Sequence, residues 1–331
     1  MNDTTPIGPW IRRFLLEHMV AERNLSRNTQ ASYRDTLKVL LPFLSAEKRT
    51  PIDRLAIEDL SSLVARRFLD YVEKERHCSG TTRNQRLAVI HSLAKFIATR
   101  SPIHLAWCAD LRSIPYKKTT QRAIDYLDKK EMDALLKTPN RRTRLGARDY
   151  ALLLFLYNTG ARADEAARLC VADLALAGAA AVRILGKGNK TRACPLWART
   201  VDVLKPLVTG LRAGDPVFRG RRNERLTRFG IYNIVRVMSK RASTASPSLA
   251  AKRVGPHTIR HTSAVHLLRA GVDLNTIRAW LGHVCLDTTN IYAEVDIEMK
   301  AKALAQCEVT EGPVVKRWKS EPALMDFLKS L

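Results

Sequence analysis

The longest uninterrupted apolar run in the chain extends from Tyr150 to Tyr157. Its eight residues are too few to cross a bilayer, so the run does not predict a membrane span. A helix that is apolar on all sides is buried in the protein interior. Asn158, Thr159 and Gly160 are typical of a helix end, and Arg162 opens the next segment directly after this turn. The chain is therefore expected to build a helical core here and to present Arg162 beside it.

Apolar residues recur at helical spacing through residues 10 to about 105. Ser26 is a candidate helix cap, a second helical pattern covers residues 57–75, and a third follows Ser79 and Gly80. This pattern predicts a small all-helical domain, which we place at residues 8–106. The third helix begins with a polar and basic run that is suited to DNA phosphates, although such a run is also typical of a solvated helix face. The basic residues proposed for DNA contact are Arg83 and Arg86.

Residues 107–125 show little apolar periodicity and contain Pro115, Lys117 and Lys118. This composition predicts a linker between two domains. A basic linker can follow the DNA backbone, so Lys117 and Lys118 are expected to contact DNA.

A second domain is expected at residues 126–310. It opens at Asp128–Glu131 with the pattern of a capping box, and residues 179–196 read as a β-hairpin around a Gly-rich turn. Helical patterns return at residues 198–207, 228–241 and 257–270. The predicted fold is mainly α-helical with a small antiparallel β-sheet. An arginine-rich segment lies between the first two of these helices, and its Arg221 and Arg222 are further candidates for DNA contact.

The tail, residues 311–331, carries an apolar stripe formed by Leu324, Phe327, Leu328 and Leu331. A lone short helix is marginally stable in water and needs a surface to pack on. The tail is therefore a candidate oligomerisation helix.

The chain carries a net charge of +24 and has a pI of about 10.2. An excess of this size, spread through the sequence, fits a footprint on double-stranded DNA, although a generally basic surface gives the same numbers. The six cysteines lie far apart without a CxxC pair, which is typical of reduced thiols in a cytoplasmic protein. The first twenty residues contain no signal-peptide pattern, and no membrane association is expected.

The stretch from His257 to Tyr292 combines the groups that phosphodiester chemistry requires. His257 and Arg260 lie three residues apart on one expected helix face, and His283 follows a glycine turn. Guanidinium and imidazole groups bind phosphate oxygens, and a phenol beside them can attack phosphorus. Taken one at a time, each residue is more ordinary: a surface arginine, a histidine in the core, or a lysine in a turn. Together they predict a phosphate site with Tyr292 as nucleophile.

Two other kinds of site are less consistent with the residues. His257 and His261 are four residues apart and could bind zinc, but no glutamate follows His257 and no third ligand is evident. The turn around Lys187 lacks the Gly-x4-Gly-Lys-Ser/Thr pattern of a nucleotide-binding loop. We therefore expect neither a metal nor another cofactor.

Five motifs in order resemble the tyrosine recombinase (phage integrase) family. They are Thr159-Gly-Ala-Arg162-Ala-Asp-Glu165, Gly186-Lys187-Gly-Asn-Lys190, His257-x-x-Arg260-His261, Leu281-Gly-His283 and Tyr292. The resemblance implies a helical core-binding domain of SAM-like fold, followed by an integrase-type α+β catalytic domain. It also implies a site-specific recombinase that acts on double-stranded DNA as a homo- or hetero-tetramer.

The resemblance also assigns roles to the catalytic residues. Tyr292 would attack the scissile phosphate and form a 3′-phosphotyrosine, while Arg162 and Arg260 clamp its oxygens. His257 would assist proton movement at the nucleophile, and Lys187 would protonate the leaving 5′-oxygen. His283 would hydrogen-bond a phosphate oxygen, and Glu165 would orient the first arginine. Two alternatives stay open: a topoisomerase-like enzyme or resolvase that cuts and reseals without partner exchange, and a catalytically silent DNA-binding accessory or regulatory protein of the same fold.

Overall fold

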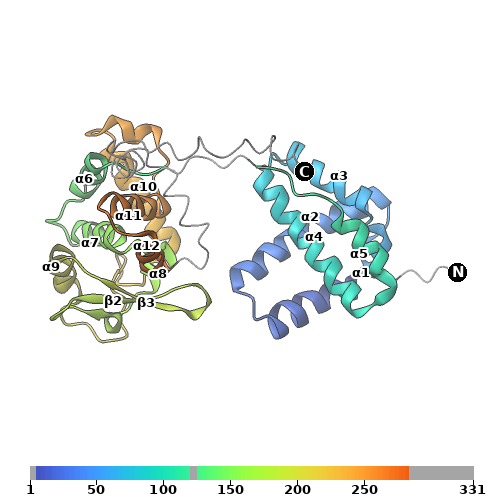
Figure 1. Ribbon diagram of the computed structural model, residues 1–331, viewed down its shortest axis with the longest axis horizontal. Helices are drawn as coiled ribbons and strands as arrows, with labels where there is room; N and C mark the ends of the chain where they lie inside the picture. Colours follow the sequence, from blue (N-terminus) through green and yellow to red (C-terminus); the bar gives the residue numbers. More distant parts are fainter. Residues whose placement is uncertain (1–4, 120–124, 283–331) are drawn as a thin grey trace, which may run out of the picture. The chain divides into compact units, whose positions relative to one another are not determined.

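The computed structural model describes residues 5–119 and 125–282, apart from the side chain of Lys187. The chain divides into two compact units, residues 1–121 and 122–331, and each is described by itself (Figure 1). The predicted tail helix at residues 311–331 lies outside the described residues.

The described part of the first unit is built from helices, as the apolar spacing predicts, with one isolated β-bridge between Pro6 and Ala56. Its longer helices begin at serine caps: the hydroxyls of Ser26, Ser61 and Ser79 each accept a hydrogen bond from an N–H group in the first turn. The helices are α1 (Ile7–Arg13), a π-helix (Phe14–Glu22), α2 (Arg27–Lys48), α3 (Ser62–Lys74), α4 (Gly80–Arg100) and α5 (Leu105–Arg112), with single 3-10 turns at Ile52–Arg54, Ile57–Asp59 and Pro102–His104.

Two expectations for this unit need correction. The helical pattern over residues 57–75 contains a 3-10 turn and then α3, because Ser61 caps a new helix start. The predicted linker over residues 107–125 is wrong for its first part, since these residues form most of α5. Cys108, Leu111 and Ile114 are buried in the core of the first unit. The boundary between the two units still falls inside residues 107–125.

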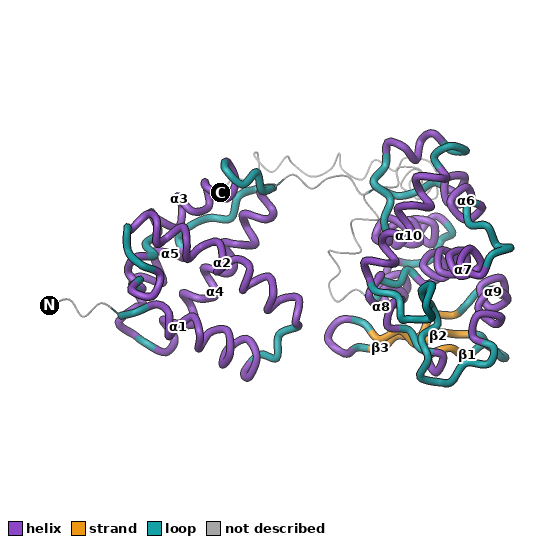
Figure 2. Tube along the Cα trace, turned by 180° about the vertical axis from the view of Figure 1, so that it is seen from behind, coloured by secondary structure: helices purple, strands orange, loops and turns teal. Residues whose placement is uncertain are grey.

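In the second unit a small sheet lies at one edge of a group of helices (Figure 2). The predicted hairpin is confirmed as β2 paired with β3, with Val182 opposite Cys194, and the short β1 adds a third antiparallel strand. The elements are α6 (Lys129–Lys137), α7 (Arg144–Thr159), α8 (Ala163–Arg168), β1 (Leu174–Ala175), β2 (Ala181–Leu185), β3 (Thr191–Pro195), α9 (Ala198–Val208), α10 (Arg228–Ala242), α11 (Pro256–Arg269) and α12 (Leu274–Leu281), with 3-10 turns at Val171–Asp173, Lys187–Asn189 and Pro247–Ala251.

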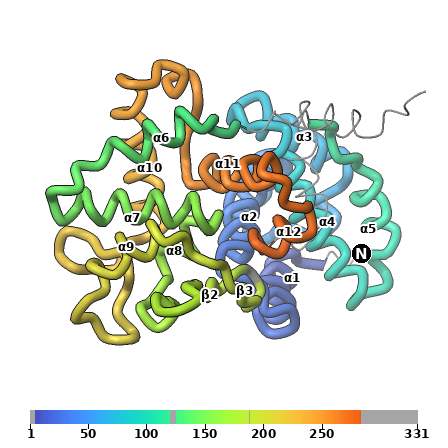
Figure 3. Tube along the Cα trace, turned by 60° about the vertical axis from the view of Figure 1, so that its left-hand side comes forward, coloured from blue at the N-terminus to red at the C-terminus, as the bar shows by residue number. Residues whose placement is uncertain are grey.

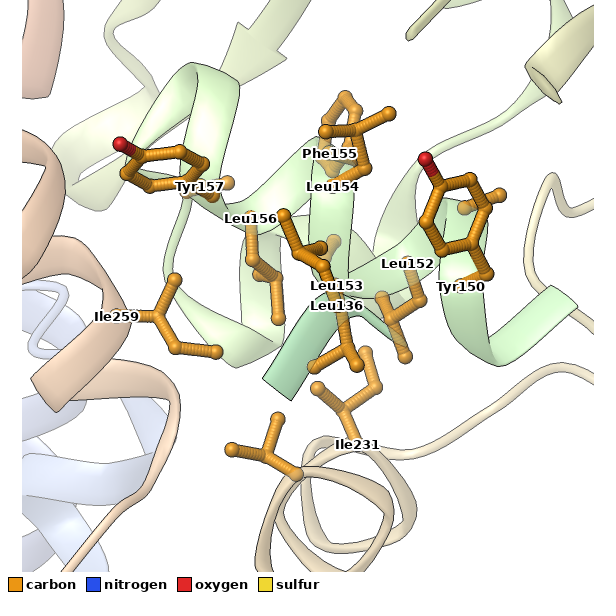
Figure 4. Close-up of a cluster of buried hydrophobic side chains, with 14 of the residues drawn as sticks. Leu136, Tyr150, Leu152, Leu153, Leu154, Phe155, Leu156, Tyr157, Ile231 and Ile259 are labelled. Carbon is orange, nitrogen blue, oxygen red and sulfur yellow. The ribbon is translucent and has the colours of Figure 1, made fainter. Parts of the chain in front are cut away.

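Helix α7 is the centre of this unit and runs between α6 and α9 (Figure 3). Every residue from Asp149 to Thr159 is buried, which confirms the expectation from the apolar run. Side chains from α6, α10 and α11 close around the helix, including Leu136, Ile231 and Ile259 (Figure 4). None of the helices within residues 5–119 and 125–282 combines the length and apolarity needed to cross a membrane.

The expected capping box at the start of α6 is also confirmed. Asp128 Oδ1 accepts a hydrogen bond from the backbone N–H of Glu131 at 2.7 Å. Glu131 Oε2 in turn accepts from the backbone N–H of Asp128 at 2.8 Å. The second unit therefore begins with a helix start that its own sequence defines.

Replacing Leu153 with alanine is expected to destabilise the second unit selectively. The side chain is fully buried in α7, so its truncation leaves a cavity and costs about 2–5 kcal/mol. Urea denaturation followed by circular dichroism should show an earlier transition of the second unit and an unchanged transition of the first. Leu185→Ala is the control because this side chain is 42% exposed on β2. Equal effects of the two substitutions would contradict the central position of α7.

Candidate active site

The site begins at the turn between α7 and α8. Gly160 ends α7 in the left-handed conformation, with φ of +59°. A Cβ atom at this position would overlap Cδ2 of Leu281, so the position has no room for a side chain. Because the turn is this tight, Arg162 follows at once as the residue that precedes α8.

Arg260 is buried in α11, with 3% of the residue exposed. Its Nη1 donates to the carbonyl oxygen of Gly160 at 2.7 Å, and its Nη2 donates to that of Leu281 at 2.7 Å. These carbonyls lie at the C-terminal ends of α7 and α12. Such carbonyls have no partner within their own helix and carry the negative end of the helix dipole. The guanidinium of Arg260 is therefore held by two helix ends that are distant in the sequence.

Glu165 lies in the first turn of α8 and its side chain is only 3% exposed. Its Oε1 accepts from Nη1 of Arg162 at 2.7 Å. Its Oε2 accepts from the backbone N–H of Arg162 at 2.9 Å and from Nη2 of Arg192 at 2.7 Å. Burial alone would raise the pKa of Glu165, but the hydrogen bonds and charges of Arg192 and Arg162 lower this pKa from 4.5 to about 2. Glu165 is consequently ionised at neutral pH.

Arg192 is a residue of this site that the sequence analysis did not single out. Its side chain is 9% exposed, and its Nε donates to the carbonyl oxygen of Trp280 at 2.8 Å. Along β3, Arg192 shares a face with Cys194, which is fully buried. A charged residue on the inward face of a strand is unusual, and this alternation is the signal that could have identified it.

His257 lies in the first turn of α11, one helical turn before Arg260. Desolvation lowers the pKa of His257, and the charges of Arg260 and Arg162 lower it further. Desolvation, together with His257 and Arg260, lowers the pKa of His261 to about 4. His257 is therefore expected to be a neutral imidazole at neutral pH, which can accept a proton.

The structure thus brings together Arg162 and Glu165 from the start of α8 and His257 and Arg260 from α11. The backbone of the hairpin turn lies beside them, since a Cβ added to Gly186 would lie 3.5 Å from Oε1 of Glu165. Lys187 is the next residue, but its side chain lies outside what the structure describes. The predicted His283 and Tyr292 also lie outside the described residues.

The basic residues proposed for DNA contact fall into two groups. At the start of α4, Arg83 donates to the carbonyl oxygen of Pro115 at 3.4 Å. The side-chain amide of Asn84 donates to the carbonyl oxygen of Lys117 and accepts a hydrogen bond from the backbone N–H of Lys117. Nζ of Lys117 is paired with Glu73 at 2.8 Å. This basic run therefore also fastens the segment after α5. Arg86 is half-buried, whereas Lys118, Arg221 and Arg222 are exposed.

Two family models match the chain in the same order as its two units. Residues 11–101 match the N-terminal SAM-like domain of phage integrases, and residues 125–299 match the phage integrase family. The second match covers more than half of the chain. The predicted fold class, a SAM-like helical domain followed by an integrase-type catalytic domain, is confirmed.

Full-length relatives are similar along almost the whole chain. An integrase/recombinase of Sinorhizobium fredii (strain NBRC 101917 / NGR234), designated y4rC, is 37% identical over 333 residues, which cover 100% of each chain. Tyrosine recombinase XerC of Pelobacter propionicus is 34% identical over 301 residues, with 88% of this chain and 93% of the relative covered. The chain therefore belongs to the phage integrase family and is a tyrosine recombinase.

Solved structures agree in fold. The integrase of transposon Tn1549, in complex with transposon right end DNA, has a TM-score of 0.69 at 14% identity and covers 90% of this chain and 99% of its own. The XerH site-specific recombinase bound to palindromic difH substrate has a TM-score of 0.68 at 21% identity, with 86% and 82% covered.

Replacing Glu165 with glutamine is expected to lower the free energy of unfolding at pH 7 by about 3–5 kcal/mol, because the buried Arg192 and the half-buried Arg162 lose their counter-charge. The pKa of Glu165 in the folded protein, about 2, lies below the ordinary value of 4.5. The ionised carboxylate of Glu165 thus makes its full contribution to the free energy of unfolding above pH 4.5. This contribution is lost as the pH falls towards 2. Urea denaturation measures the free energy of unfolding of the wild type and of the variant. The difference between these two free energies should become smaller as the pH falls from 4.5 towards 2.

Asp164→Asn is the matched control for this prediction. Asp164 lies beside Glu165, but its side chain is 54% exposed and pairs with Arg168 on the surface. Removing it should change the stability by no more than about 0.5 kcal/mol. A Glu165→Gln variant as stable as this control at pH 7 would contradict the structural role of the buried carboxylate.

Proposed function

We propose that this protein is a site-specific recombinase that cuts and rejoins double-stranded DNA through a 3′-phosphotyrosine formed by Tyr292. The observation that supports this most directly is the convergence of Arg162 and Arg260 on one site. Arg260 is held at the end of α12, and the chain continues from that end towards His283 and Tyr292. The family assignment supplies the reaction class.

In the proposed reaction the phenol oxygen of Tyr292 forms a bond to phosphorus, and the bond from phosphorus to the 5′-oxygen breaks. His257 takes the phenol proton, and its lowered pKa keeps the imidazole unprotonated and therefore able to accept that proton. Lys187 gives a proton to the departing 5′-oxygen, which leaves as a hydroxyl. Rejoining is the reverse, with a 5′-hydroxyl from either DNA strand as the nucleophile.

Charge stabilisation comes from the arginine pair and His283. The phosphodiester already carries one negative charge, a second develops on its non-bridging oxygens as the fifth bond to phosphorus forms, and preorganised guanidinium groups stabilise both. Glu165 keeps Arg162 in place through two hydrogen bonds. This scheme draws its energy for rejoining from the phosphotyrosine bond, so it requires neither ATP nor a metal ion.

We propose double-stranded DNA with specific recombination sites as the substrate and a homo- or hetero-tetramer as the active assembly. Among the structural neighbours, XerH is bound to difH DNA, and a lambda integrase dimer is bound to a core site. The helical domain at residues 8–106, the catalytic domain at residues 126–310 and the segment between them would each contact the duplex. The residues proposed to contact the DNA backbone are Arg83, Arg86, Lys117, Lys118, Arg221 and Arg222.

The wild-type protein is expected to form a covalent adduct with DNA that survives denaturation, and Tyr292→Phe is expected to form none. Footprinting first identifies the duplex that the protein protects. A nick placed beside the cleavage position then lets the released 5′-hydroxyl fragment diffuse away, so that the intermediate accumulates. The adduct is measured as a band of reduced mobility on a denaturing gel. Unchanged DNA binding by Tyr292→Phe is the control. A wild type that binds but forms no adduct would instead support the catalytically silent accessory protein.

Deleting residues 313–331 is expected to leave binding to a single DNA site intact and to weaken the assembly of paired sites. The deletion removes the apolar stripe that would dock on a neighbouring protomer. Gel-shift assays with one-site and two-site DNA separate the two effects. Unchanged recombination by the truncated protein would refute an oligomerisation role for the tail.

A further inference from the structure

Arg192 on β3 contacts both α8 and the end of α12, and it takes no direct part in the proposed reaction. We propose that Arg192 is a positioning residue for the recombinase reaction: it holds Glu165 against Arg162 and at the same time fixes the end of α12. The inference rests on the proposed function, because it concerns the efficiency of the same phosphate site.

The first link runs from Arg192 through Glu165 to Arg162. The side chains of Arg192 and Glu165 are 9% and 3% exposed, whereas that of Arg162 is 32% exposed, so two buried groups stand behind a half-buried arginine. Glu165 Oε2 is shared between Nη2 of Arg192 and the backbone N–H of Arg162. Its Oε1 is thereby directed at Nη1 of Arg162. Arg192 consequently determines the orientation of the carboxylate that orients the phosphate-binding arginine.

The second link runs from Arg192 to the end of α12. Its Nε donates to the carbonyl oxygen of Trp280, a group that α12 itself leaves without a partner. Gly282 packs directly on the same side chain: an added Cβ would lie 3.2 Å from Cδ and 3.3 Å from Nη1 of Arg192, and φ at Gly282 is +67°. The backbone at Gly282, immediately before His283, therefore packs against the side chain of Arg192.

A guanidinium is suited to this position in a way that an ammonium is not. Nε and Nη2 lie on one planar edge and donate in fixed directions to two acceptors from different elements. A lysine would keep the charge opposite Glu165, but it has a single donor atom and no fixed fork. The substitution Arg192→Lys therefore separates the charge of this residue from its geometry.

The experiment measures DNA affinity and single-turnover adduct formation separately, with the full-length protein and the nicked duplex. Arg192→Gln is expected to form adduct about 10²-fold more slowly, because misplacement of a phosphate-binding group costs roughly this much. Its DNA affinity should stay within about threefold, and Arg192→Lys should recover part of the rate. Arg183→Gln is the matched control: it removes the same charge from the same hairpin, but that side chain is 65% exposed and pairs with Asp173.

A double-mutant cycle with Glu165 tests whether Arg192 acts through the carboxylate. The variant Glu165→Gln/Arg192→Gln should be no slower than the slower single variant, because both substitutions break one chain of contacts. This variant also removes a buried positive and a buried negative charge together, so it remains informative if Arg192→Gln alone does not fold. Multiplicative losses in the cycle would overturn the inference.

Other outcomes separate this inference from the proposed function. If the wild-type protein forms no covalent adduct with DNA, the proposed function itself is refuted. A wild type that forms adduct, with Arg192→Gln or Arg192→Lys reacting at the wild-type rate, overturns only the positioning role. Parallel losses of affinity, thermal stability and rate in Arg192→Lys would show a merely structural arginine and would also overturn it.

Discussion

The site depends most on the burial of one guanidinium between two helix ends. A buried charge is costly unless it is paired or hydrogen-bonded, and Arg260 meets this condition with the terminal carbonyls of α7 and α12. Those carbonyls would themselves lack partners without Arg260. The arrangement is mutual: two helix ends hold the arginine, and the arginine holds the two ends together. The close approach of Gly160 to Leu281 is possible only because residue 160 has no side chain.

The carboxylate of Glu165 plays a complementary part among the cations. Arg162, Arg192 and Arg260 would repel one another if they were crowded without compensation. Glu165 offsets part of this repulsion by pairing with two of them, which is also why its pKa falls to about 2. Three guanidinium groups and one carboxylate still leave an excess of positive charge. That excess suits a phosphate group, whose own charge would increase during the proposed reaction.

Much of the fold follows from local sequence signals. The apolar run of α7, the capping box at Asp128 and the hairpin around Gly186 are each encoded by neighbouring residues, and each is present in the structure. The errors arose where a local pattern was weak. Helix α5 has little apolar periodicity, and it is helical because Cys108 and Leu111 pack into a core made by distant residues. Ser61 divided a segment whose apolar spacing suggested one helix.

By itself, the sequence determined the family, because its motifs are local and occur in a characteristic order. The same motifs predicted Arg162, Glu165, His257 and Arg260 as site residues. Only the tertiary structure decided which groups hold them in place. Arg192 is 27 residues from Glu165 and 88 residues from the carbonyl it binds at Trp280. Pairings of this kind depend on where β3, α8 and α12 meet. A backbone carbonyl also carries no side-chain signature, so no residue pattern announces that it is the partner of a buried arginine.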